Sequence, residues 1–171
     1  MSRILVAGMG NVLRLDDGFG VELARRLTQA WAPPAAPARV VEVGIGGVHL
    51  VQELMAGYDA LVVLDAVERG SPPGTLHVLA AEVPALETWP EERRRAFLAD
   101  THYATPTKAL ILARALDVLP STVYLVGCQP ADADSAGIGL SEPVALALDR
   151  AVGVVEELVR RIATEQLEQP R

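Results

Sequence analysis

The stretch "GMGNVLRLDDGFG" at residues 8–20 joins the apolar run "ILVA" (4–7) to the amphipathic segment "VELARRLTQAW" (21–31). A short apolar run that ends in Gly-x-Gly is typical of a strand buried on both faces, and the segment that follows has helical spacing. The sequence therefore predicts a strand, a turn and a helix, with the adjacent carboxylates Asp16 and Asp17 in the turn. These carboxylates could cap the helix, hold a cation or belong to a nucleotide-binding loop.

Composition predicts one folded domain over residues 1–171 and excludes two classes of partner. Half of the residues are hydrophobic and 22% are charged, which is typical of a globular protein. The net charge of −7 would repel a phosphate backbone, so we expect no nucleic-acid partner. No uncharged apolar stretch reaches the roughly 20 residues of a membrane helix, so we expect no membrane span.

The first residues and the cysteine content predict a cytoplasmic protein. Residues 1–8 begin a strand pattern at once, with Arg3 but without the apolar region and cleavage site of a secretory signal. Cys128 is the single cysteine and has no partner for an intramolecular disulfide. Both observations agree with a reducing compartment.

Strand patterns alternate with helix patterns along the rest of the chain. We expect further strands at 39–44, 60–67, 75–82 and 122–130. We expect helices over 19–31, 48–55, 107–119 and 143–167, with one or two helical turns at 91–95. This order predicts an α/β fold, a three-layer α/β/α sandwich with a mostly parallel sheet and an antiparallel strand near one edge. In such sheets, ligands bind at the carboxyl ends of the strands.

The unusual polar residues fall at those predicted strand ends. Asp16 and Asp17 follow the first strand, Asp65 ends the apolar run "LVVL" (61–64), and His102 lies in a loop before a helix. A buried carboxylate without a partner costs several kcal/mol unless it is paired or coordinates a metal. Two or three carboxylates and one imidazole suit a divalent cation such as nickel or zinc. Helix caps, a strand-end turn and an exposed loop histidine are the structural alternatives.

Other chemistries find little support in the sequence. A dinucleotide fingerprint requires G-x-G-x-x-G, but Gly8 and Gly10 are followed by Leu13. The chain has no GK[ST], HExxH or G-x-S-x-G motif. Cys128 lacks a nucleophile signature, and a cysteine at a strand end is usually a small buried hydrophobe.

Four motifs together resemble the hydrogenase maturation endopeptidases, which trim the carboxyl-terminal extension from the large subunit of nickel-iron hydrogenases once nickel is installed. They are "GMGNVLRLDDGFG" (8–20), "LVVLDAVERGSPPGTL" (61–76), "THYATPTKAL" (101–110) and "VGCQPADADSAGIGLSEPV" (126–144). The family's fold, a twisted five-stranded sheet between helix layers, agrees with the sandwich predicted above.

The resemblance assigns roles to particular residues. It implies that Asp17, Asp65 and His102 are the metal-binding and catalytic residues, while Asp16 caps the helix or supports the site. It also implies that the nickel arrives with the large-subunit precursor and is not a resident cofactor. The cation could polarise the scissile carbonyl or activate a water, with a carboxylate as base, which leaves the attacking group open.

Two other functions remain open at this point. The chain could be a maturation chaperone that senses the metal in the large subunit without cutting it, or a broader peptidase with its own tightly held metal. The sequence leaves the oligomeric state and the particular hydrogenase open.

Overall fold

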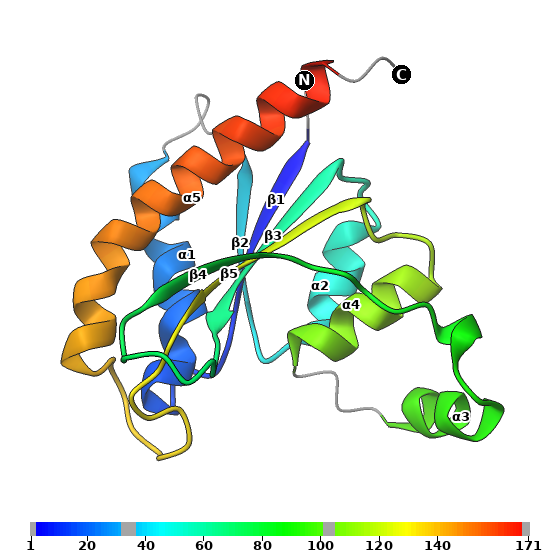
Figure 1. Ribbon diagram of the computed structural model, residues 1–171, viewed down its shortest axis with the longest axis horizontal. Coiled ribbons are helices and arrows are strands. Elements are labelled where there is room, and N and C mark those ends of the chain that lie inside the picture. Colours follow the sequence, from blue (N-terminus) through cyan, green and yellow to red (C-terminus); the bar gives the residue numbers. More distant parts are fainter. Residues whose placement is uncertain (1–2, 32–36, 101–104, 169–171) are drawn as a thin grey trace.

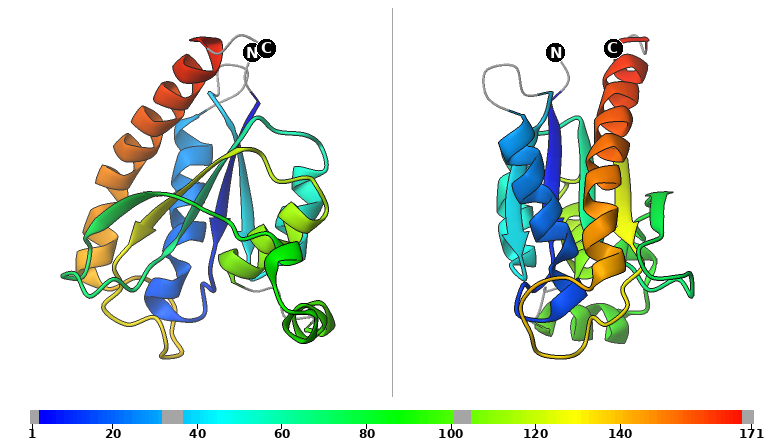
Figure 2. Two further views of the ribbon diagram at one scale, coloured as in Figure 1. Left: turned by 45° about the vertical axis from the view of Figure 1, so that its right-hand side comes forward. Right: turned by 90° about the vertical axis from the view of Figure 1, so that its left-hand side faces the viewer.

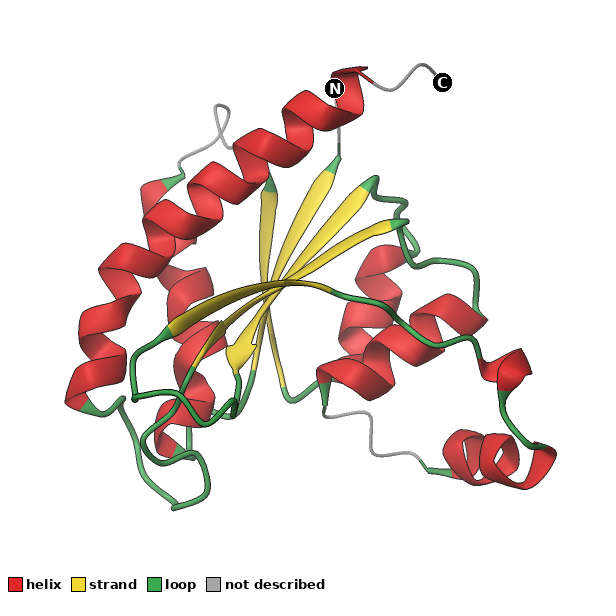
Figure 3. Ribbon diagram, in the orientation of Figure 1, coloured by secondary structure: helices red, strands yellow, loops and turns green. Residues whose placement is uncertain are grey.

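A twisted β-sheet lies between two layers of helices in the computed structural model, which describes residues 3–31, 37–100 and 105–168 (Figures 1 and 3). The strands are β1 (Ile4–Met9), β2 (Arg39–Gly44), β3 (Ala60–Ala66), β4 (Leu76–Ala80) and β5 (Thr122–Cys128). The α-helices are α1 (Phe19–Ala30), α2 (Gly47–Leu54), α3 (Glu91–Ala99), α4 (Pro106–Ala115) and α5 (Glu142–Glu168). Two 3-10 turns complete the described elements, η1 (Leu15–Gly18) and η2 (Leu86–Thr88).

The sheet confirms the predicted fold class. The order of the five strands that the structure describes is β2-β1-β3-β5-β4. β1 pairs in parallel with β2 and β3, and β3 pairs in parallel with β5. β4 runs antiparallel to β5 at the edge, as its alternating pattern predicts. The chain turns from β1 to β2 on one side and to β3 on the other, which creates a topological switch point at the carboxyl end of β1.

Each face of the sheet carries its own hydrophobic core. Helices α1 and α5 cover one face, and Figure 2 shows them side by side. Phe19, Leu23 and Leu27 of α1 pack there with Val62, Leu64 and Val126 of the sheet and with Val155 and Ile162 of α5. Helices α2 and α4 cover the other face, where Leu50 and Leu54 pack with Leu5, Leu61, Val63 and Leu110. Helix α3 projects beyond α4 and buries none of its residues. No helix among the described residues is both long and apolar enough to span a membrane.

Helix α4 ends four residues before the predicted limit of 119, so that boundary was wrong. Asp117 adopts the left-handed conformation, with φ 56°. The Val118 N–H then donates to the Ala113 carbonyl at 3.0 Å, which closes the helix with a Schellman-type bond. Asparagine and aspartate tolerate this conformation better than most residues, which explains the early stop.

The start of α1 lies unusually close to the sheet because two glycines face each other. A Cβ on Gly20 would overlap the backbone carbonyl oxygens of Leu64 and Met9, and one on Gly8 would overlap Gly20 itself. Both glycines belong to the stretch that opens the chain's first strand-turn-helix unit. Their missing side chains bring the first turn of α1 down onto the ends of β1 and β3.

We expect Gly20→Ala to lower the free energy of unfolding by about 1–3 kcal/mol, because the added methyl group forces backbone apart in a packed core. Gly153→Ala is the matched control, since Gly153 lies within α5 with open space around it. That substitution should raise stability by up to about 1 kcal/mol through helix propensity. Urea denaturation of both variants checks this, and equal effects would contradict the close packing of α1.

Candidate metal-binding site

Asp17 and Asp65 lie on neighbouring strand ends at the topological switch point. Asp17 is in η1, the next element after β1, and Asp65 is the penultimate residue of β3. β1 and β3 are paired neighbours in the sheet, so their carboxyl ends meet at the same edge. The structure therefore brings together two of the residues predicted as ligands although 48 positions separate them in the sequence.

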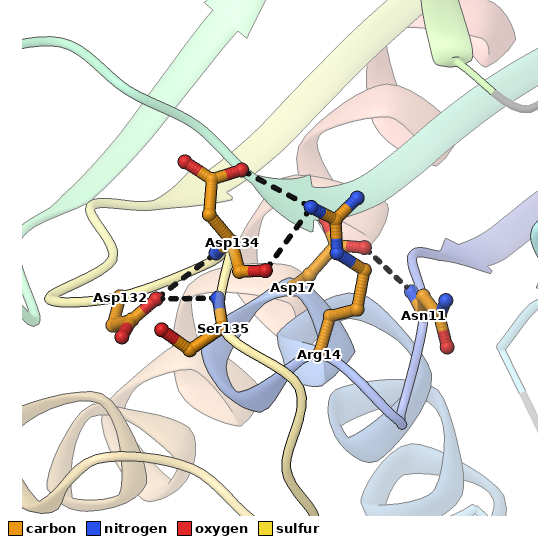
Figure 4. Close-up of polar contacts among 6 residues, drawn as sticks. All are labelled: Asn11, Arg14, Asp17, Asp132, Asp134 and Ser135. Atoms are coloured by element: carbon orange, nitrogen blue, oxygen red, sulfur yellow. Dashed lines mark hydrogen bonds and ion pairs between the residues drawn. The ribbon is translucent and has the colours of Figure 1, made fainter.

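Gly10 makes room for the two acids to approach. It has φ 118°, and a Cβ there would overlap the Asp17 backbone carbonyl. The same Cβ position lies 3.6 Å from Asp65 Oδ1. The Asn11 N–H donates to Asp17 Oδ2 at 2.9 Å, which holds the carboxylate in place (Figure 4). Gly10 and Asn11 thus set the position of Asp17 beside Asp65.

The electrostatics of this pair suit a cation. Burial raises the pKa of Asp65 to about 7, and the nearby negative charge of Asp17 adds to the rise, while a backbone hydrogen bond from Ala66 opposes it. Within the described residues, no lysine or arginine forms an ion pair with either acid. Two oxygen donors with an unneutralised charge fit a divalent metal of the borderline or hard type.

The third predicted ligand, His102, lies outside the described residues. Helix α4 begins at Pro106, four positions further along. Among the residues that the structure describes, no group of three His, Cys, Asp or Glu side chains could hold a metal. The pair Asp17 and Asp65 is therefore the described part of the site, and the three-residue ligand set stays a prediction.

Asp16 has a structural role that the capping interpretation missed. The N-cap of α1 is Gly18, and no side chain caps the helix. Asp16 is completely buried. Its Oδ2 accepts hydrogen bonds from the Ala131 and Asp132 N–H groups at 2.8 and 3.1 Å. Ser141 donates from its N–H to Oδ1 at 2.6 Å and from its hydroxyl to Oδ2 at 2.8 Å.

These bonds join η1 to residues 131–141, the loop between β5 and α5. Backbone pairing extends the contact, because the Leu15 N–H donates to the Gly137 carbonyl and the Gly137 N–H donates to the Leu13 carbonyl. Arg14 forms an ion pair with Asp134 at 3.3 Å across the two loops (Figure 4). The loop beyond β5 thus supports the turn that carries Asp17, a contact between residues more than 110 positions apart.

Two residues at the end of β5 also have structural roles. Cys128 is buried, and burial together with the nearby Asp16 raises the pKa of its thiol to about 11. A protonated, buried thiol is a poor nucleophile, in agreement with the sequence analysis. Gln129 is buried, accepts from the Arg69 and Ser71 N–H groups and donates to Glu68, which ties the loop after β3 to β5.

The fold and site define an α/β protein with a partly buried pair of acids at the switch point of a mostly parallel sheet. The model of the hydrogenase maturation protease family matches residues 21–158. The hydrogenase expression/formation protein HupM of Azotobacter chroococcum mcd 1 is 36% identical over 152 residues, 88% of this chain and 68% of that protein. HupD of Rhodobacter capsulatus is 34% identical over 161 residues, 94% of this chain and 71% of that protein.

Solved structures of hydrogenase maturation peptidases have the same fold as this chain. The hydrogenase maturating endopeptidase HybD from E. coli superposes with a TM-score of 0.72 at 28% identity, over 93% of both chains. The hydrogenase 2 maturation peptidase from Thaumarchaeota archaeon SCGC_AB-539-E09 gives 0.65 at 32% identity, over 92% of this chain and 97% of that one. The chain belongs to the hydrogenase maturation protease family, a family of peptidases.

We expect Asp16→Asn to lower the free energy of unfolding by about 3 kcal/mol, because the amide nitrogen cannot accept the hydrogen bonds that the carboxylate receives. Asp134→Asn is the matched control in the same loop, since its side chain is fully exposed and its ion pair with Arg14 is weak. Chemical denaturation measures both variants. Similar losses of stability in the two variants would show that the hydrogen bonds of Asp16 do not stabilise the turn more than an exposed ion pair does.

We expect the metal-free protein to lose stability as the pH rises from 5 to 8. The folded chain holds the Asp65 proton up to about pH 7, whereas the unfolded chain releases it near the ordinary value of 3.8. The unfolded state therefore binds fewer protons in this window, and stability falls with pH by on the order of 2 kcal/mol. Denaturation of the wild type and Asp65→Asn in chelator tests this. The variant should have a flatter profile, and parallel profiles would contradict the assignment.

Proposed function

We propose that this protein is an endopeptidase that removes the carboxyl-terminal extension of a nickel-iron hydrogenase large-subunit precursor after nickel insertion. In this proposal Asp17, Asp65 and His102 recognise the nickel in the precursor, and the reaction takes place in the cytoplasm. The observation that carries the proposal is the partly buried pair Asp17 and Asp65, which no lysine or arginine neutralises within the described residues, at the switch point of a chain from this family.

The chemistry of the pair supports recognition of a metal that comes with the substrate. Asp65 is protonated over part of the neutral range, so a cation must displace that proton when it binds. The Asn11 N–H holds Asp17 through Oδ2, so in this proposal Oδ1 is the oxygen that binds the cation. The bound cation would supply Lewis acidity toward a carbonyl or a water. Cleavage then depends on metal loading, because Asp17 and Asp65 form a complete metal site only when the precursor brings its cation.

We expect Asp17→Ala, Asp65→Ala and His102→Ala each to reduce processing by at least about 100-fold while the protein stays folded, because each removes a ligand and not core packing. The assay incubates the nickel-loaded precursor with each variant and follows the shortened large subunit by mass spectrometry. Glu165→Ala is a control on the exposed surface of α5. Full activity in all three site variants would exclude the site.

The alternative functions give different results in the same experiment. A metal-sensing chaperone would bind the nickel-loaded precursor, but its mass would not change. A peptidase with a resident metal would be purified with near-stoichiometric metal and would cut precursor that lacks nickel. Elemental analysis and a nickel-free reaction distinguish these cases from the proposal.

A further inference from the structure

An apolar groove lies next to the turn that carries Asp17. We propose that this groove binds apolar side chains of the precursor polypeptide close to the bond that is cut. The inference rests on the proposed function and extends it from recognition of the metal to recognition of the chain beside the metal. The groove has a volume of about 410 Å³, within the range of pockets that bury small ligands.

The two walls of the groove come from segments that Asp16 joins. One wall is the turn after β1, and the other is the loop and first turns of α5. Their apolar side chains are Val12, Leu13, Leu15, Ile138, Leu140 and Leu148. Gly18 also lines the groove and is the next residue after Asp17. The groove therefore begins within one residue of a candidate metal ligand.

Apolar side chains at the rim are unusually exposed to solvent. Ile138 is 84% exposed and Leu13 is 60% exposed. They come from opposite walls, and burying both side chains against a bound chain would favour binding through the hydrophobic effect. Isolated exposed leucines are common on protein surfaces, but these two flank one groove beside a candidate active site.

The charges of the groove indicate an uncharged occupant. Glu22 and Arg25 are the charged residues that line it, and they form an ion pair with each other at 2.6 Å. Arg25 is bound further by Glu42 at 2.9 Å. Since its cation is already neutralised, the groove offers no free positive charge to an acidic peptide. Apolar side chains of an extended chain fit it best.

The backbone conformation of Leu15 places its side chain in the apolar wall of the groove. Leu15 has φ 43°, a conformation that favours glycine. Its side chain packs against Gly137, where any Cβ would overlap it. A leucine in this conformation keeps an apolar side chain between the two loops at a cost in backbone strain.

The test combines changes on both sides of the proposed contact. The groove variant carries Leu13→Asp and Ile138→Asp, which affect exposed side chains and should leave the fold intact. The control is Leu146→Asp, a 68% exposed leucine of α5 that does not line the groove. The substrates are the nickel-loaded precursor and the same precursor with the apolar residues beside the cleavage site changed to serine. Circular dichroism confirms that each protein is folded.

We expect the groove variant to raise KM by about tenfold or more with little change in kcat, because it removes binding that is equal in the ground and transition states. The serine precursor should raise KM for the wild type by a similar factor and add little for the groove variant. Leu146→Asp should behave as the wild type. An unchanged KM in the groove variant, or fully additive effects, would overturn the inference while leaving the proposed function in place.

Failure of the proposed function gives a different result. If the wild type does not shorten the nickel-loaded precursor, binding of the intact precursor is measured by fluorescence anisotropy with the same proteins. If only the groove variant binds the precursor more weakly, the groove is the contact through which this protein binds the precursor without cutting it. Absent binding, or equal binding by all three proteins, overturns it. A concentration-dependent dimer that the groove variant abolishes, with precursor binding unaffected, would assign the groove to a second copy of this chain and would also overturn it.

Discussion

The buried carboxylate of Asp16 is the interaction on which the arrangement of the candidate site depends. A charge removed from water costs several kcal/mol unless it is fully hydrogen-bonded. Asp16 meets this requirement with donors from Ala131, Asp132 and Ser141, and charge-assisted bonds of this kind are stronger than neutral ones. The bonds fix the turn after β1 against the loop after β5. Because Asp17 follows directly in the chain, any shift of this contact would move the carboxylate that lies near Asp65.

The two adjacent acids of the turn have opposite electrostatic situations. The Asp16 carboxylate accepts hydrogen bonds on both oxygens and needs no cation to stabilise it. Asp17 lies near Asp65, and burial together with the negative charge of Asp17 raises the pKa of Asp65 to about 7. The first acid gives the turn its rigidity, and the second gives it an unneutralised charge. A rigid turn that holds an uncompensated charge is suited to a cation, because the Asp17 carboxylate is already held in position.

Local sequence patterns predicted most of the fold and only part of the site. Strands such as β3 are apolar runs whose burial follows from the sheet itself, and β4 shows the alternation of an edge strand. The juxtaposition of Asp17 and Asp65 followed from strand ends sharing one edge. The resemblance left Asp16 either capping the helix or supporting the site, and local patterns could not decide between them, because its partners lie 115 to 125 positions away and capping rules consider only the neighbouring turn. The end of α4 at Ala115 depended on the left-handed Asp117, which helical periodicity does not register.

One short turn supplies both a candidate metal ligand and a wall of the apolar groove. Asp17 is one member of the acid pair, while Leu15 and Gly18 of the same 3-10 turn line the groove. Since Asp16 anchors this turn from within, the relative positions of carboxylate and groove are set by the backbone and cannot vary independently. A polypeptide seated in the groove would therefore be held at a fixed distance from a cation at the pair. A protease built this way can require both features at once, a loaded metal and the correct neighbouring chain, because a substrate that offers only one of them gains only part of the binding free energy.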